Sequence, residues 1–91
     1  MSTPIQASAG TLESNDIFIV IAPGDSPENS VSLTSIVMKQ FGPAILEVIN
    51  RSLAECGLTG LSVTAQDKGA LDCTIKARME AAIARYKELQ S

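Results

Sequence analysis

The chain has 91 residues, of which 45% are apolar and only 3% aromatic, and its net charge is −3. This length allows one domain with a modest aliphatic core, and the acidic balance argues against a protein that binds phosphate backbones through clustered Lys and Arg. Because the sequence contains no histidine, it lacks the usual serine and cysteine triads and His-rich zinc sites, and we expect neither a catalytic nor a metal site in the chain itself.

The N-terminal part of the sequence predicts a β-hairpin. Residues 1–7 are small and polar with one proline, so we expect a flexible arm at the start of a single domain that covers residues 1–91. Residues 9–13 predict a weak strand, and residues 17–22, rich in β-branched side chains, predict a strong interior strand. Between them, "SND" has the residues of a tight turn. Ser14 is therefore expected at or beside the hairpin tip.

The middle of the chain predicts a third short strand followed by a helix. "SVSLT" alternates apolar and polar residues, as a strand does. The apolar stripe at helical spacing after it consists of Val37, Phe41, Ile45, Ile49, Leu53 and Cys56. Thr34 or Ser35 can cap its start, and Gly57 suits a left-handed end, with Leu58 against Leu53. Gly42-Pro43 leaves two alternatives, a bent helix or a short turn before a helix that starts at Pro43.

The last third of the chain predicts a fourth strand in "GLSVTAQ", a turn in "DKG" and a helix over residues 70–89. The buried stripe of this helix consists of Leu71, Ile75, Met79, Ala82, Ile83, Tyr86 and Leu89. The predicted fold class is α+β, with a small four-stranded mixed sheet, built from the hairpin, the third strand and a β-α-β unit, and two helices on one face.

The start of the chain and its cysteines predict a cytoplasmic protein. "MSTPIQASAG" lacks the features of a secretory signal, and no stretch approaches the roughly 18 apolar residues of a membrane span. Cys56 and Cys73 are then interpreted as reduced thiols. Without a histidine beside it, Cys73 is more simply a small half-buried residue than a reactive thiol, and Cys56 more simply belongs to the core.

Two short stretches contain residues that could serve a function. Ser14 has no base beside it in the sequence, so a separate enzyme would have to act on it, and a basic pocket of that enzyme could recognise Glu13 and Asp16. A plain turn serine is the simpler interpretation from the residues alone. "DKGALDC" could form a recognition surface, but its acidic residues favour a turn followed by a helix start.

The segments "AGTLESND", "IAP", "KQFG" and "DKGALDC" together resemble the acyl carrier (gamma) subunit of bacterial citrate lyase, over residues 7–85. In that family a serine of the first motif carries 2'-(5''-phosphoribosyl)-3'-dephospho-coenzyme A through a phosphodiester. The matching residue is Ser14, with Glu13, Asn15 and Asp16 as presenting or recognition residues. The sequence departs from the family pattern at Asn15, where glycine is frequent, and at Gly42-Pro43, where an acidic residue tends to follow the glycine.

The resemblance implies a non-catalytic carrier whose cofactor and partners perform the chemistry. A prosthetic-group transferase would load it, an alpha subunit would exchange acetyl for citrate on the thioester, and a beta subunit would cleave the citryl group to oxaloacetate. No nucleic acid or membrane partner is implied. The carriers of malonate decarboxylase and citramalate lyase are the nearest alternatives. An alternative of another class is a non-enzymatic interaction module in which Ser14 is only a turn residue.

Overall fold

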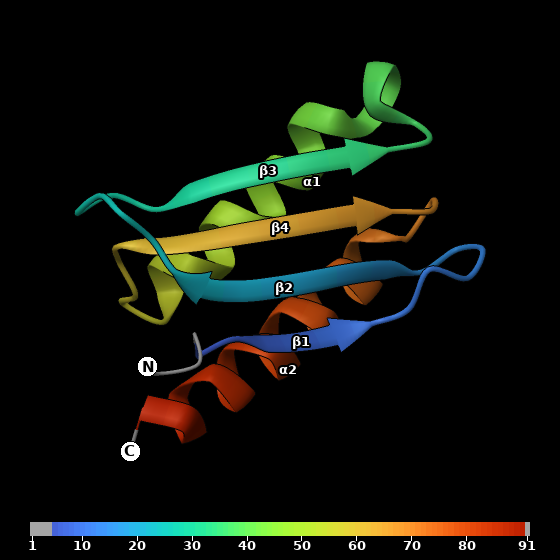
Figure 1. The fold of residues 1–91 in the computed structure, drawn as a ribbon. Helices are drawn as coiled ribbons and strands as arrows, with labels where there is room; N and C mark the ends of the chain where they lie inside the picture. The colour runs from blue at the N-terminus through green and yellow to red at the C-terminus, as the bar shows by residue number, and fades with distance from the viewer. Residues whose placement is uncertain (1–4, 91) are drawn as a thin grey trace.

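Two helices pack on one face of a four-stranded sheet in the computed structural model, which describes residues 5–90 (Figure 1). The elements in chain order are β1 (Ala7–Gly10), β2 (Ile17–Pro23), β3 (Ser30–Ser35), α1 (Met38–Glu55), β4 (Leu61–Asp67) and α2 (Asp72–Gln90). The strands lie in the order β1-β2-β4-β3, with β3 and β4 parallel and the other neighbours antiparallel. This arrangement confirms the predicted α+β fold and its mixed sheet.

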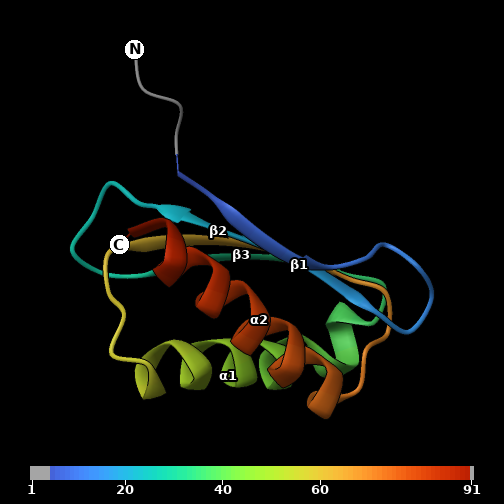
Figure 2. The same cartoon turned by 90° about the horizontal axis from the view of Figure 1, so that it is seen from below.

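The hydrophobic core lies between the sheet and the two helices (Figure 2). Alternate residues of each strand point to the helices, because successive side chains of a strand lie on opposite faces. The central strands contribute Ile17, Ile19, Ile21, Leu61, Val63 and Ala65, and the helices contribute Ile45, Ile49, Leu53, Ile75, Met79 and Ile83, all of them buried. Within residues 5–90 no helix covers the other face of the sheet, where Phe18 and Val20 are half-buried.

Helix α1 is continuous through Pro43, and its first turn lies at an angle to the rest (Figure 2). Proline supplies no N–H to the helix, so a bend at this point is expected, and the first of the two alternatives is confirmed. The predicted C-terminal cap is also confirmed. Gly57 has φ +67° and donates its N–H to the carbonyl of Ala54, while Leu58 donates to Leu53 at 3.2 Å.

The start of α1 differs from the prediction. The helix begins at Met38, and its N-cap residue, Val37, forms no side-chain cap. The Ser35 hydroxyl accepts a hydrogen bond from the Val37 N–H at 3.0 Å, so it organises the turn before the helix instead of capping the helix. Phe41, placed on the buried stripe by its spacing, is 52% exposed because it lies in the angled first turn.

Four further predictions need correction. Leu71 is 71% exposed because it precedes α2 and therefore lies outside the helical stripe. Leu89 is 50% exposed in the last turn of α2, which extends past the start of β1 (Figure 1). The first strand covers Ala7–Gly10, not residues 9–13, because the chain leaves the sheet at Gly10. Residues 1–4 of the predicted arm lie outside the described residues, and Ala7, its last residue, already belongs to β1.

Within the described part of the chain, neither helix is long and apolar enough to cross a membrane.

Candidate functional site

The loop between β1 and β2, residues 11–16, follows Gly10, the last residue of β1, and extends beyond the end of the sheet (Figure 1). Gly10 has φ +93°, a backbone conformation that favours glycine. A Cβ atom built there would lie 1.8 Å from the carbonyl oxygen of Ile17, so the backbone of β2 approaches Gly10 too closely for any side chain. At the other end of the loop, Asn15 has φ +65°, which asparagine tolerates better than most residues. The predicted turn role of Asn15 is thus confirmed.

Asp16 ties the loop to the body of the protein. It is 7% exposed, and Arg78 of α2 donates hydrogen bonds from Nε and Nη2 to its two carboxylate oxygens, each at 3.0 Å. The Thr11 hydroxyl donates to the same carboxylate at 2.7 Å, and the Ile17 N–H donates at 2.7 Å. The Arg78 guanidinium and the Thr11 hydroxyl hold the pKa of Asp16 at about 2, below its usual 3.8, although burial acts in the opposite direction.

This geometry corrects one expectation from the sequence. Asp16 was expected to be open to a basic pocket of another enzyme, but both of its carboxylate oxygens are bonded within the protein. The basic group that pairs with Asp16 is the chain's own Arg78. Glu13, by contrast, is exposed on the loop. Of the two flanking acids, only Glu13 offers its charge to a partner.

The turn after β4 supports the loop from the other side. The Asn15 N–H donates to the carbonyl of Lys68 at 2.8 Å, and the Lys68 N–H donates to the carbonyl of Asp16 at 2.9 Å. The buried Asp67, 1% exposed, holds this turn in place. Its carboxylate accepts hydrogen bonds from the N–H groups of Gly69 and Ala70. The structure therefore brings together "AGTLESND" and "DKGALDC", which lie some fifty residues apart in the sequence.

Ser14 lies between these anchored residues and is itself exposed. Among residues 5–90, no protein group forms a hydrogen bond with its hydroxyl, so nothing there activates it as a nucleophile. The same part of the chain contains no group of three or more Cys, Asp or Glu residues that could hold a metal ion. The site presents a free hydroxyl on a loop whose backbone is held on both sides. Such a site suits modification by another enzyme.

Arg78 is the site residue that sequence reasoning missed. It lies on α2, three residues after buried Ile75 and 62 residues from Asp16, so no local pattern connects the two. In the sequence, the one signal that points to a basic partner is the acidic Asp16 directly before an apolar strand. Cys73 was expected to be half-buried and is exposed, whereas Cys56 packs partly against the core as expected.

Comparisons with known proteins show the family. Residues 5–86 match the acyl carrier (ACP) family model described as malonate decarboxylase delta subunit (MdcD). The citrate lyase acyl carrier protein of Klebsiella pneumoniae is 44% identical over 93% of this chain and 88% of that protein. The citrate lyase acyl carrier protein of Lacticaseibacillus casei (strain BL23) is 53% identical over 90% of this chain and 80% of that protein.

One solved structure shares the fold over nearly the whole chain. A chain of a Pseudomonas malonate decarboxylase hetero-tetramer, determined in complex with malonate, superposes with a TM-score of 0.78. It is 18% identical in sequence, and the match covers 93% of this chain and 89% of that chain. At this identity the likeness supports the fold, and the relatives above support the family.

Proposed function

The chain belongs to the family of citrate lyase acyl carrier proteins, and on this premise we propose that Ser14 is the residue to which its prosthetic group is attached. The observation that carries the proposal is the exposed Ser14 hydroxyl, without a protein hydrogen-bond partner in residues 5–90, on a loop fixed at Gly10 and Asp16. The proposed group is 2'-(5''-phosphoribosyl)-3'-dephospho-coenzyme A, joined through a phosphodiester to the serine oxygen.

The loop fits such a group. A phosphodiester on Ser14 would extend into solvent, because Leu12, Glu13, Ser14 and Asn15 are all exposed. The anchored carboxylate of Asp16 is neutralised by Arg78, which limits its repulsion of a phosphate placed two residues away. We propose that Asn15 and Asp16 present the serine and that the exposed Glu13 is recognised by the transferase that loads it.

The group, once attached, supplies a thiol that holds the acyl group as a thioester. The chain contributes a fixed attachment point, and the tether keeps the thioester at a high effective concentration near the active sites of partner subunits. We propose the alpha and beta subunits of citrate lyase as these partners, with acetate and oxaloacetate as products. The cytoplasmic location predicted from the sequence remains a prediction.

A second candidate is the carrier of malonate decarboxylase. Two observations favour it, namely the description of the family model and the fold shared with the Pseudomonas enzyme. The relatives at 44–53% identity are named for citrate lyase, so we propose citrate as the substrate. Citramalate lyase would use the same carrier chemistry, and substrate assays with the partner subunits distinguish the three.

Intact mass tests the attachment. The protein, produced with an active transferase, should gain the mass of one prosthetic group, and Ser14→Ala should gain none. Ser32→Ala removes an exposed serine of β3 and serves as the matched control, which should load normally. A wild-type protein that stays unmodified beside an active transferase would contradict the proposal. Adding the partner subunits should then give oxaloacetate from citrate and no product from malonate.

A further inference from the structure

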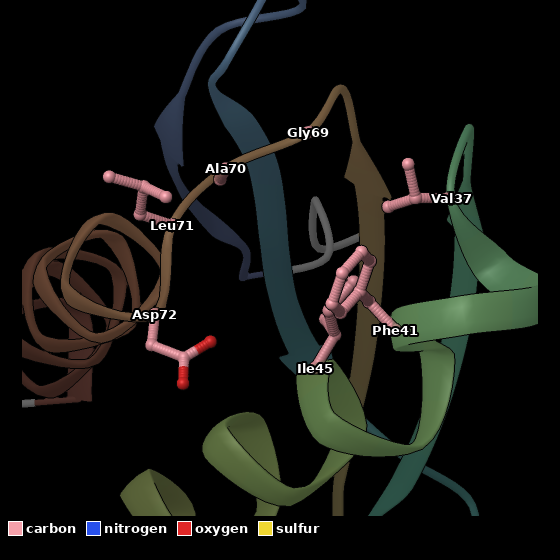
Figure 3. Close-up of a pocket in the computed structure, with 7 residues that line it drawn as sticks. All are labelled: Val37, Phe41, Ile45, Gly69, Ala70, Leu71 and Asp72. Atoms are coloured by element: carbon pink, nitrogen blue, oxygen red, sulfur yellow. The ribbon is translucent and has the colours of Figure 1, made fainter.

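An apolar pocket of about 280 Å³ lies between the first turns of α1 and the segment that leads into α2 (Figure 3). Phe41 and Ile45 project into it from α1, and Asp72 faces them from the start of α2. Val37 closes the side next to β3, while Leu71 lies at the rim and points away. The pocket therefore combines an aromatic ring, aliphatic side chains and one carboxylate.

The exposure of Phe41 suggests what the pocket can bind. The ring is 52% exposed although it lies within an apolar hollow, so one of its surfaces is available to a ligand. Planar bases stack on exposed aromatic rings, and an apolar site gains orientation from a few polar groups. The Asp72 carboxylate is a hydrogen-bond acceptor, which suits the exocyclic amino group of a base such as adenine. The charge of Asp72 disfavours a second carboxylate inside the pocket, such as that of a citryl group, but not a neutral base.

The pocket adjoins the loop that carries Ser14. Gly69, which lines the pocket, follows Lys68, whose carbonyl accepts the hydrogen bond from the Asn15 N–H. A Cβ atom on Gly69 would lie 3.7 Å from Oδ1 of Asn15, so the Asn15 side chain also lies beside a residue that lines the pocket. The loop, the turn after β4 and the first turn of α1 gather at one end of the sheet in both Figure 1 and Figure 2.

We propose that this pocket binds the adenine of the group carried on Ser14, an inference that rests on the proposed function. In that group the attaching phosphoribosyl unit is joined to the 2' oxygen of the adenosine ribose, so the base is closer to the serine than the pantetheine arm is. Phe41 stacks on the adenine, and Asp72 accepts a hydrogen bond from its amino group. The arm beyond the pyrophosphate remains free to reach partner active sites.

Methyl resonances of the protein test the inference without an activity assay. Intact mass first establishes that the sample is loaded, so a failure of attachment is recognised separately from a failure of the pocket. On loading, the methyl resonances of Val37 and Ile45 should shift, because the ring current of a bound adenine acts on neighbouring groups. Those of Leu89, on the last turn of α2, should stay unchanged.

Variants assign the shifts to the pocket. Phe41→Ala should load normally and lose most of the loading-induced shift of the Ile45 methyl resonances. Asp72→Ala should reduce the same shift. Leu89→Ala, at a similarly exposed position, should retain the full shift. The unloaded Ser14→Ala protein with equimolar adenosine monophosphate should show little shift, because it lacks the tether.

Three results would overturn the inference. The first is a loaded protein whose Val37 and Ile45 resonances match those of the unloaded protein. The second is a shift that persists in full in both Phe41→Ala and Asp72→Ala. The third is a shift of the Val37 and Ile45 resonances that occurs only when the partner subunits are added, which would identify the pocket as a protein-docking surface.

Discussion

The Asp16–Arg78 pair is the residue-scale feature that fixes the candidate attachment loop. Two hydrogen bonds of 3.0 Å join the guanidinium to a carboxylate whose side chain is only 11% exposed. Paired groups of this kind stabilise more than surface ion pairs do, because the carboxylate has lost most of its water. We expect Asp16→Asn to lower the free energy of unfolding at neutral pH by about 1–2 kcal/mol. Urea denaturation, with exposed Asp25→Asn as the control, measures this loss.

The same pair predicts a pH dependence of stability. The pKa of Asp16 is about 2 in the folded protein, below the usual 3.8, chiefly because of Arg78. The unfolded chain therefore takes up this proton at a higher pH than the folded protein does. The contribution of Asp16 is present above about pH 4 and is lost as the pH falls toward 2. Between pH 5 and pH 3, wild type should lose more stability than Asp16→Asn, and equal losses would contradict the pairing.

Alanine substitutions at Gly10 and Gly57 separate two costs, the strain of a left-handed backbone and the steric clash with a neighbouring strand. Both have positive φ, but a Cβ atom at Gly10 would meet the Ile17 carbonyl, whereas nothing lies within 4 Å of one at Gly57. Gly57→Ala should cost about 1 kcal/mol for its left-handed conformation alone. Gly10→Ala should cost clearly more and should separate β1 from β2 locally. Thermal unfolding of the two variants decides this, and equal costs would show that the close approach is unimportant.

At the scale of elements, the β1–β2 loop behaves as an extension of the sheet. The backbone bonds between Asn15, Asp16 and Lys68 continue the pairing of β2 with β4 beyond Ile17. Amide hydrogen exchange should therefore be slower at Asn15 than at Ser14, whose N–H has no protein acceptor within the described residues. Exchange measured by NMR on the unloaded protein tests this. Equal, fast exchange at both amides would mean that the loop is not held.

The elements that could be predicted are those with strong local signals. The β-branched run of β2 and the helical spacing of Ile45, Ile49 and Leu53 reflect burial directly, and Gly57 marks a helix end by its own backbone freedom. The sequence alone does not decide between a bend and a new helix start at Pro43, because proline permits both. Leu71 was misplaced because apolar spacing does not reveal where a helix begins.

The candidate site was predictable only in part. The turn chemistry around Asn15 and the resemblance to a carrier family both pointed to Ser14. The fold was needed to show that Arg78 pairs with Asp16, since that contact joins residues 62 positions apart. It was also needed to show that the turn at Lys68 supports the loop and that Phe41 opens into a pocket beside it.

At the scale of the whole molecule, the features that bear on function lie at one end of the sheet. The Ser14 loop, the turn after β4 and the first turn of α1 lie together at that end (Figure 1). A carrier subunit needs few structural features beyond an accessible attachment loop on a folded domain. It has to offer one hydroxyl to a transferase and afterwards keep the tethered acyl group within reach of partner active sites.

Peptide-level mass spectrometry of the loaded protein directly tests whether the prosthetic group is attached to Ser14. Cleavage after glutamate should give a fragment of residues 14–28, which contains only two serines, Ser14 and Ser26. This fragment should carry the whole added mass, and fragmentation should place the phosphodiester on Ser14. An added mass found on Ser26, or on any other fragment of the chain, would contradict it.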